Sequence, residues 1–231
     1  MNIVINGGTR GIGREIALIM SGDKSNKLLV SGRNANALSR LAETAVNRNI
    51  CTHVTDMSLF DKNEKAFMDA VCDCFTHVDI LINNAGYLVH CDFMNFDIKE
   101  ARTLMETNFF GPASVVRILQ PLMKRGSHIV NISSMGGFQG SSKYRGMSYY
   151  SASKAALSCL SECLAAEFRE SGITVNCLAL GSVQTEMFEE AFPGFKAPVN
   201  AKEMGRFIAE FAMSGNRFFN GKVIPVAFSD P

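Results

Sequence analysis

The most constraining feature of this chain is a regular alternation of short apolar segments with longer segments of helical periodicity. Several short segments are almost continuously apolar, as in Ile80, Leu81 and Ile82, which is typical of strands covered on both faces. Strands are expected at 2–6, 28–31, 51–54, 80–83, 128–132, 174–179 and 223–226, and helices near 12–20, 35–47, 61–75, 101–123 and 151–171. This order predicts an α/β fold with a doubly wound parallel sheet and helices on both faces.

The whole chain, residues 1–231, is expected to form one domain. Its 231 residues suit a single α/β sheet, and 47% of them are hydrophobic, which is enough for a large core. The sequence contains no internal repeat and no linker rich in proline or serine. Loop-rich composition is confined to residues 136–148 and 186–201.

Charge and cysteine content restrict the partners. Lys and Arg number 23 against 22 Asp and Glu, so neither nucleic acid nor a membrane surface is an expected partner. No secretory signal and no apolar run near the roughly 20 residues of a membrane span is found. Seven scattered cysteines fit reduced thiols in a cytoplasmic protein. Cys72, Cys74 and His77 end a helical segment without a second ligand pair, so no metal site is expected.

A glycine-rich turn follows the first strand directly and opens a helix. It comprises Gly7, Gly8, Thr9, Arg10, Gly11, Ile12 and Gly13. Glycine lets the backbone turn tightly and approach a pyrophosphate, while the helix N-terminus offers free N–H groups and a positive dipole end. Glycine turns are common, so a purely structural turn is the alternative. The position between a strand and a helix favours a dinucleotide site in a Rossmann-type sheet.

The end of the second strand indicates which dinucleotide is preferred. Gly32 and Arg33 stand where a fold that binds NAD usually carries an acidic residue for the ribose 2′-OH. A second arginine, Arg10, lies inside the glycine turn. Two guanidinium groups suit a 2′-phosphate, because arginine pairs with phosphate oxygens in a fork. NADP(H) is therefore the expected cofactor over NAD(H), the alternative being two solvated surface arginines.

A tyrosine and a lysine at helical spacing form the candidate catalytic pair. Tyr150 and Lys154 are four residues apart, so they share one helix face. A nearby ammonium favours the phenolate and should lower the pKa of the tyrosine into a useful range. Ser133 and Ser134 end a buried strand at the carboxyl edge of the sheet, where ligands bind in such folds. Alone, this spacing also fits an ordinary amphipathic helix face.

Taken in order, these motifs resemble the short-chain dehydrogenase/reductase family. The resemblance rests on Gly7-x-x-x-Gly11-Ile12-Gly13, Asn83-Asn84-Ala85-Gly86, Ser134 and Tyr150-x-x-x-Lys154, and runs from residue 1 to about 185. The pair Arg10 and Arg33 is similar to the NADP-preferring branch. The resemblance implies an NADP(H)-dependent oxidoreductase that transfers a hydride between nicotinamide and a carbonyl or secondary alcohol substrate. The competing hypothesis is a non-catalytic nucleotide-binding regulatory or signalling protein on the same fold.

The resemblance also implies roles for single residues. Tyr150 would be the general acid or base, and Lys154 would lower its pKa and bond the nicotinamide ribose. Ser134 would hold the substrate oxygen, with Ser133 as the alternative, and Asn108 would anchor a proton-relay water. The implied cofactor contacts are Gly7, Thr9, Arg10, Gly11, Ile12, Gly13, Arg33, Asp56 at the adenine, Asn84, Ala85, Gly86, Tyr150, Lys154, Gly181, Val183 and Thr185 at the carboxamide.

Other positions depart from the family pattern. Asn6 replaces a common threonine, and Leu180 replaces a proline before Gly181, which should make that loop less rigid. Residues 141–148 form a longer insertion beside the substrate, whose positive charges suggest either an anionic group there or a solvated loop. Residues 186–201 should form a short, Phe-rich lid over an apolar substrate.

The C-terminal strand should lie at an edge of the sheet, because Pro225 cannot donate a ladder hydrogen bond. Family members assemble through the long catalytic helix and this terminal region, so a homodimer or homotetramer is expected.

Overall fold

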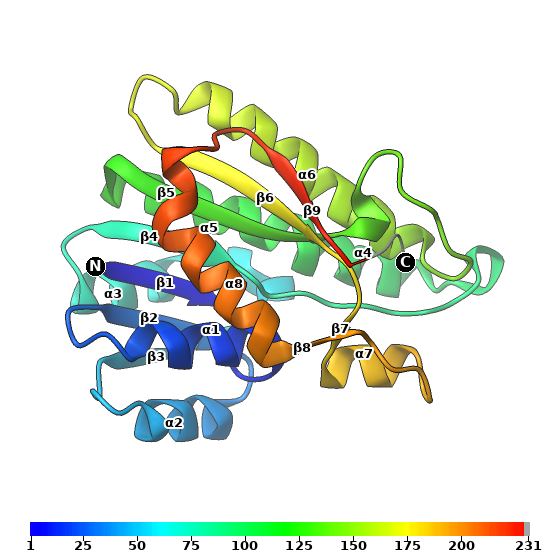
Figure 1. Cartoon of the computed structure of the whole chain (residues 1–231), viewed down its shortest axis with the longest axis horizontal. Helices are drawn as coiled ribbons and strands as arrows, with labels where there is room; N and C mark the ends of the chain where they lie inside the picture. Colours follow the sequence, from blue (N-terminus) through cyan, green and yellow to red (C-terminus); the bar gives the residue numbers. More distant parts are fainter. Residues whose placement is uncertain (229–231) are drawn as a thin grey trace.

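The computed structural model describes residues 1–228 and contains a seven-stranded parallel sheet in the order β3-β2-β1-β4-β5-β6-β9 (Figure 1). The strands are β1 Asn2–Asn6, β2 Lys27–Gly32, β3 Ile50–Val54, β4 Val78–Asn83, β5 Met123–Ser134, β6 Thr174–Leu180 and β9 Val223–Val226. The order reverses between β1 and β4, so a crevice opens at the carboxyl ends of these strands. The predicted Rossmann-type α/β class and all seven predicted strands are confirmed.

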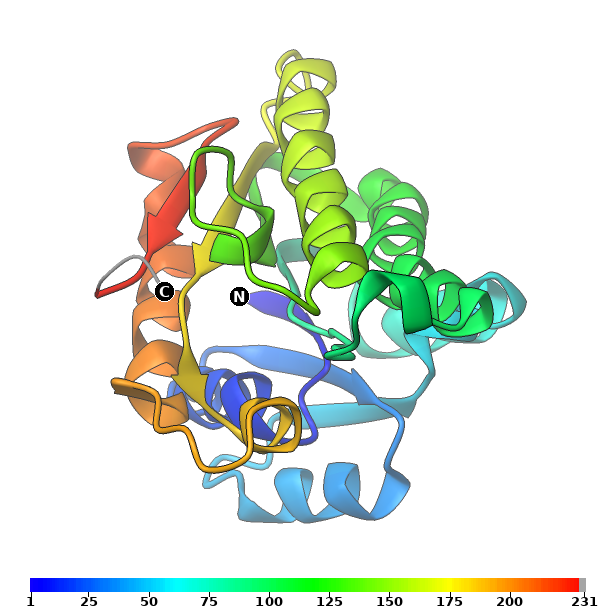
Figure 2. The same cartoon turned by 90° about the vertical axis from the view of Figure 1, so that its right-hand side faces the viewer.

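Helices cover both faces of the sheet, as Figure 2 shows in the end-on view. The helices are α1 Gly11–Ser21, α2 Ala35–Thr44, α3 Glu64–Cys74, α4 Ile98–Met105, α5 Gly111–Leu119, α6 Ser148–Glu167, α7 Glu186–Ala191 and α8 Ala201–Ser214. One core cluster joins the sheet to α1, α2 and α8, and the other joins it to α3, α5 and α6. Successive side chains of β1 point to opposite faces of the sheet, as is usual in a strand. Ile3 and Ile5 therefore pack in the first cluster and Val4 packs in the second.

The helix boundaries differ from the sequence prediction in several places. The single helix expected at 101–123 is α4, a π-helical turn η3 (Glu106–Phe110) and α5. The helices expected at 35–47 and 151–171 are α2 and α6, which end at Thr44 and Glu167. The tract expected as loop after residue 185 contains α7 and is followed by α8, which was not predicted.

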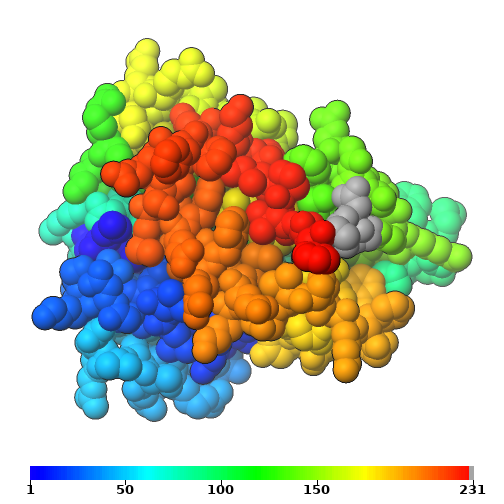
Figure 3. All heavy atoms as spheres, in the orientation of Figure 1, coloured from blue at the N-terminus to red at the C-terminus, as the bar shows by residue number. Residues whose placement is uncertain are grey.

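Helix α8 packs beside α1 and covers one face of the sheet, as its orange atoms show in Figure 3. Its buried side chains include Met204, Ile208 and Phe211, at helical spacing. A capping box starts the helix, because Asn200 accepts from the Glu203 N–H and the Glu203 carboxylate accepts from the Asn200 N–H. Both signals are present in the sequence and could have identified this helix.

The C-terminal edge agrees with prediction, since β9 pairs only with β6 among the described strands and places Pro225 in an edge strand. No helix in the described part of the chain is long and apolar enough to cross a membrane. Across residues 1–228, no three His, Cys, Asp or Glu side chains gather as a metal site would require. All seven cysteines are free thiols.

We expect Ile208→Ala to destabilise the chain by about 2–5 kcal/mol, because Ile208 is fully buried between α8 and the sheet. Urea unfolding followed by circular dichroism measures this change. Arg206→Ala, on the exposed side of the same helix, is the matched control and should change stability by less than about 0.5 kcal/mol. Equal, small effects of both variants would show that α8 contributes little to the core.

Candidate active site

A cavity of about 290 Å³ lies at the carboxyl ends of the central strands and reaches from the glycine turn to α7. Its size is close to the lower end of usual ligand pockets. The predicted site residues line this cavity, with the exceptions of Gly13 and Asn108. The structure therefore brings most of the predicted residues together at one cavity, although they come from distant parts of the chain.

The glycine turn is packed tightly against the loop after β4. A Cβ on Gly7 would lie 2.6 Å from the Ala85 Cα, and Gly7 has a φ of +82°, so a side chain cannot be placed there. A Cβ on Gly13 would lie 2.1 Å from the Gly7 carbonyl oxygen, which explains why Gly13 serves packing and does not reach the cavity. Asn84 Nδ2 donates to the same oxygen at 2.9 Å.

Helix α1 begins at this turn, and its N-cap residue, Arg10, makes no side-chain capping bond. The first N–H groups of α1 therefore lack a side-chain cap, and Gly11 and Ile12 line the cavity, where an anion could accept hydrogen bonds from this helix start. The close backbone approach at Gly7 and this uncapped helix start fit the pyrophosphate of a dinucleotide. The donor set of the turn thus agrees with the cofactor that the sequence predicts.

The two arginines both line the cavity but differ in their environment. Arg10 Nη1 lies 2.5 Å from Glu190 Oε1, and its Nη2 lies 3.3 Å from Glu190 Oε2. This hydrogen bond raises the pKa of Arg10. Arg33 is exposed and forms no salt bridge within the described residues. The sequence predicted that both arginines lie at the site, and both line the cavity, but it did not reveal the carboxylate that pairs with Arg10.

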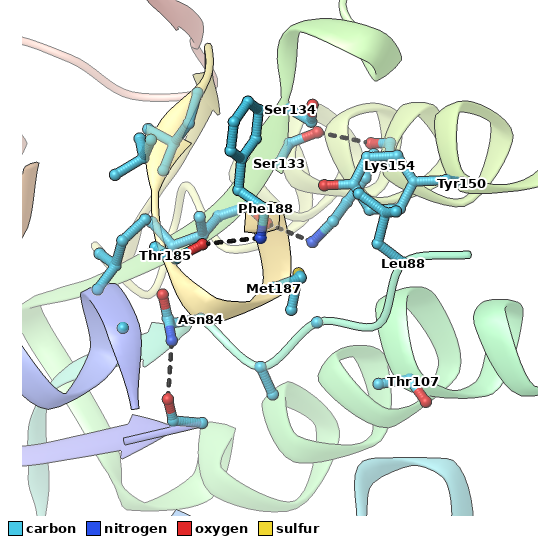
Figure 4. A pocket seen from close by; sticks show the side chains of 18 of the residues that line it. Asn84, Leu88, Thr107, Ser133, Ser134, Tyr150, Lys154, Thr185, Met187 and Phe188 are labelled. Atoms are coloured by element: carbon cyan, nitrogen blue, oxygen red, sulfur yellow. Dashed lines mark hydrogen bonds between the residues drawn. The ribbon is translucent and has the colours of Figure 1, made fainter. Parts of the chain in front are cut away.

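Tyr150 and Lys154 lie on the same part of α6, and Ser134, at the end of β5, lies close to them (Figure 4). The Lys154 Nζ donates to the Ile132 carbonyl oxygen at 2.9 Å and lies 5.9 Å from the centroid of the Tyr150 ring. Burial lowers the pKa of Lys154 to about 8. Burial raises the pKa of Tyr150, and a hydrogen bond with Ser134 opposes that rise.

This result corrects the expected electrostatics of the pair. The spacing predicted that the ammonium would lower the pKa of Tyr150, whereas burial raises that pKa. The reason is that both groups are removed from water, and the Lys154 ammonium bonds a backbone carbonyl and lies over the ring. Sequence shows which groups are neighbours but not how deeply each is buried.

The two serines at the end of β5 have different surroundings. The Ser133 hydroxyl donates to the Lys154 carbonyl oxygen at 2.8 Å and accepts from Ser158, so it is occupied within the protein. Ser134 is only half-buried and accepts a bond from the Gly136 N–H at 3.2 Å. Ser134 is therefore better placed than Ser133 to reach a ligand in the cavity.

Asn108 lies in the π-helical turn and is fully buried. Its Oδ1 accepts from the Tyr87 N–H and its Nδ2 donates to the Tyr87 carbonyl oxygen, both at 2.8 Å. Nδ2 also donates to the Ser153 hydroxyl at 2.9 Å. The side chain thus joins the loop after β4 to α6 beside Lys154, and its proposed contact with a relay water stays a prediction.

A row of buried polar side chains crosses the sheet just below the cavity, at one level of the strand register. Ser31 donates to the Asn6 amide oxygen, and each amide then donates to the next one. The bonds Ser31–Asn6, Asn6–Asn83, Asn83–Asn131 and Asn131–Ser161 are each 2.8 Å long. We call these five residues the amide row. The change from threonine to Asn6 is therefore compatible with a hydrogen-bonding role.

The other predicted cofactor contacts lie along the cavity wall. Asp56 accepts from the N–H and hydroxyl of Ser58, which orders the turn after β3. Thr185 caps α7 by accepting from the Phe188 N–H at 3.2 Å. Leu180, expected to loosen its loop, is instead buried within β6 opposite Val226.

The opposite end of the cavity is apolar. Figure 4 shows Leu88, Met187 and Phe188 facing the space beside Tyr150. The lining there also includes Met135, Tyr144, Met147 and Phe192. Residues 186–201 form α7 and the two-residue strand β8 (Val199–Asn200), which pairs with β7 (Val183–Gln184).

The positive charges of the insertion are directed away from this space. Lys143 Nζ donates to the Phe138 carbonyl oxygen at 2.7 Å, and the Arg145 guanidinium pairs with Asp92. Of the two interpretations that the sequence left open for residues 141–148, the solvated loop fits these contacts. The anionic group is not supported.

The comparisons with known proteins agree with this geometry. The family model described as "short chain dehydrogenase" matches residues 1–194. A mouse "Dehydrogenase/reductase SDR family member 7B" is 35% identical over 192 residues, covering 80% of this chain and 58% of the relative, so the chain spans about three fifths of that protein's length. An oxidoreductase of Staphylococcus epidermidis is 29% identical and covers 87% of this chain and 86% of its own length.

Solved structures show the same fold over nearly the whole chain. A "short chain dehydrogenase/reductase family protein" is 25% identical, with a TM-score of 0.85 over 98% of this chain and 95% of that one. A short chain dehydrogenase from Burkholderia cenocepacia, solved in complex with NADP, is 23% identical, with a TM-score of 0.87 over 97% of this chain and 95% of that one.

We expect Asn83→Ala to lower the free energy of unfolding by about 2–4 kcal/mol, because it leaves the Asn6 amide donor and the Asn131 amide oxygen buried without partners. Chemical denaturation measures the loss. Asn95→Ala, at an exposed position, is the control and should be nearly neutral. A neutral Asn83 variant would mean that the amide row adds little to stability.

Proposed function

This chain belongs to the short-chain dehydrogenase/reductase family of oxidoreductases, and we propose that it transfers a hydride between NADP(H) and a carbonyl or secondary alcohol carbon. The observation that carries the proposal is the meeting of Tyr150, Lys154 and Ser134 at one end of a cavity. The other end holds the glycine turn and two arginines. One continuous space therefore joins a dinucleotide cradle to acid-base groups.

The cofactor assignment follows from the chemistry of each part of the cavity. The glycine turn and the start of α1 would hold the pyrophosphate, and Arg10 with Arg33 would bind the 2′-phosphate that distinguishes NADP(H) from NAD(H). Asp56 would contact the adenine, Lys154 the nicotinamide ribose, and Thr185 the carboxamide. When bound, the nicotinamide supplies or accepts the hydride. The complex of the Burkholderia cenocepacia relative with NADP supports this choice.

The proton is assigned to Tyr150 Oη. In reduction, the carbonyl carbon gains a hydride and its oxygen gains the Tyr150 proton, which yields the alcohol; oxidation is the reverse. Ser134 would hold the substrate oxygen, since it lies beside Tyr150 (Figure 4) and lines the cavity. Burial raises the pKa of Tyr150, which favours the protonated phenol that reduction needs. Asn108 would act with Lys154 in returning a proton to the tyrosine.

The substrate is proposed to be apolar. Methionine and aromatic side chains surround the space beside Tyr150, and Lys154 is the charged side chain among the described residues that line this end. The nearby Lys143 and Arg145 are bonded within their own loop and to Asp92. A carboxylate or phosphate on the substrate would find no cationic side chain at this end other than Lys154, which already donates to the Ile132 carbonyl oxygen, so an apolar ketone or alcohol fits better.

We also propose that residues 1–231 form one catalytic domain with a cytoplasmic location, for which the free cysteines are the supporting feature. Assembly into a homodimer or homotetramer is proposed because members of this family assemble through the long catalytic helix and the C-terminal region. The exposed face of α6 carries small or weakly polar side chains, which include Ala152, Ala155, Cys159 and Cys163.

Tyr150→Phe tests the proposed function. The phenol proton is lost while the ring remains, so NADPH-dependent reduction of an apolar ketone should fall by about 10²–10⁴-fold, with NADPH binding retained. Initial rates and fluorescence titration measure the two quantities. Tyr149→Phe is the matched control, because the Tyr149 ring packs against Phe93 and Phe96. Full activity in the Tyr150 variant would refute the assignment, and an inactive wild-type chain that still binds NADPH would favour a regulatory protein.

The shifted pKa values predict different pH profiles for the two directions. Alcohol oxidation needs the Tyr150 phenolate, and the raised pKa means that this phenolate forms only at alkaline pH. The kcat/KM of oxidation should therefore rise from about pH 7 to about pH 10. Reduction needs the protonated phenol, which the raised pKa of Tyr150 preserves over this range. Any decline of reduction over the same range should instead follow the loss of charge on Lys154, whose pKa is about 8. A flat oxidation profile, with cofactor binding unchanged, would contradict this role for Tyr150.

A further inference from the structure

We propose that Glu190 on α7 sets the preference for the cofactor by competing with the 2′-phosphate for Arg10. The inference rests on the proposed function, because it assumes that Arg10 contributes to the 2′-phosphate site. In the structure the Glu190 carboxylate bonds the guanidinium that the phosphate would need. Loading of NADP(H) then requires release of Glu190, whereas NAD(H) has no 2′-phosphate to compete.

The geometry of the pair is that of an anion bound by arginine. Arg10 Nη1 and Nη2 face the two oxygens of Glu190 at 2.5 and 3.3 Å, which is a two-bond fork. A phosphate uses the same fork of donors, so carboxylate and phosphate are alternatives at one site. Arg10 precedes the first residue of α1 and lines the cavity. Figure 2 shows α7 close to the start of α1.

The charges of Glu186 and Arg33 also act on the pair formed by Arg10 and Glu190. The carboxylate of Glu186, also on α7, contributes to the raised pKa of Arg10 and lies 3.5 Å from the Cβ position of Gly11. The hydrogen bond with Arg10 lowers the pKa of Glu190, and the charge of Arg33 lowers it further. Glu190 therefore lies within the field of both arginines that were assigned to the 2′-phosphate.

Glu189 provides an internal comparison because it stands one residue away on the same helix. Its carboxylate accepts from Gln184 Nε2 at 2.7 Å and has no bond to either arginine within the described residues. The two glutamates have the same charge and similar exposure. A general effect of negative charge on α7 would act through both, whereas competition for Arg10 would act through Glu190 alone.

The expected effect is moderate. The side chains of Arg10 and Glu190 are 44% and 63% exposed, and exposed ion pairs are weak. Removal of the Glu190 charge should therefore tighten the binding of a 2′-phosphate by about three- to fivefold. Release of Glu190 should also free α7, which carries Met187 and Phe188 at the substrate end, so loading of NADP(H) should alter the apolar cavity.

The test is calorimetric titration of the full chain with adenosine 2′,5′-diphosphate and with adenosine 5′-diphosphate. Glu190→Gln should lower the Kd of adenosine 2′,5′-diphosphate by about three- to fivefold and change the Kd of adenosine 5′-diphosphate by no more than about twofold. Glu189→Gln should leave both ligands as in the wild type. Arg33→Ala should weaken the first ligand selectively, and it reports on the 2′-phosphate site without involving Glu190.

The outcomes separate this inference from the proposed function. If the wild type prefers the 2′-phosphate and Arg33→Ala removes that preference, but Glu190→Gln changes nothing, the competition is refuted and NADP(H) specificity stands. If the Glu190 variant tightens both ligands equally, the carboxylate repels any nucleotide and does not set specificity. If the wild type binds both ligands equally and Arg33→Ala alters neither, the NADP(H) assignment fails and this inference fails with it.

Discussion

The amide row is the interaction on which the rest of the site depends. Ser31, Asn6, Asn83, Asn131 and Ser161 connect β2, β1, β4, β5 and α6 through consecutive 2.8 Å bonds in the buried sheet. A shift of one residue in any of these strands would leave buried amides without partners, so the row favours one register. The strands that it aligns end in the glycine turn, in the loop of Asn84 and at Ser134. Residues that are distant in sequence therefore lie together at the carboxyl ends of these strands.

Burial then determines the charge state of the groups held above this row. Lys154 and Tyr150 are removed from water, and each is shifted toward its neutral form, since burial disfavours an ammonium and a phenolate alike. The Lys154 ammonium is stabilised by one backbone carbonyl, that of Ile132. In the proposed enzyme, the ribose hydroxyls of the cofactor would add partners to this ammonium. Its charge, and its influence on Tyr150, would then depend on the cofactor being present.

The features predicted correctly from sequence are those encoded by local pattern. Continuous apolar runs identified the strands, and the spacing of Tyr150 and Lys154 identified a shared helix face. The amide row could not be predicted because it requires the register of four strands, and the π-helical turn at Asn108 has no local signature. The burial that raises the pKa of Tyr150 is a property of the whole fold. Helix α8 was missed despite its capping box, because the tract before it was interpreted as a loop.

The pairing of Arg10 with Glu190 joins residues 180 positions apart, so it belongs to the same class of unpredictable contacts. Its consequence follows from the small size of α7. This helix has six residues, is capped by Thr185, and presents Met187 and Phe188 to the substrate end while Glu190 faces the cofactor end. Under the proposed competition, release of Glu190 would loosen a helix whose other side chains line the apolar wall. The selection of cofactor would then be coupled to the selection of substrate.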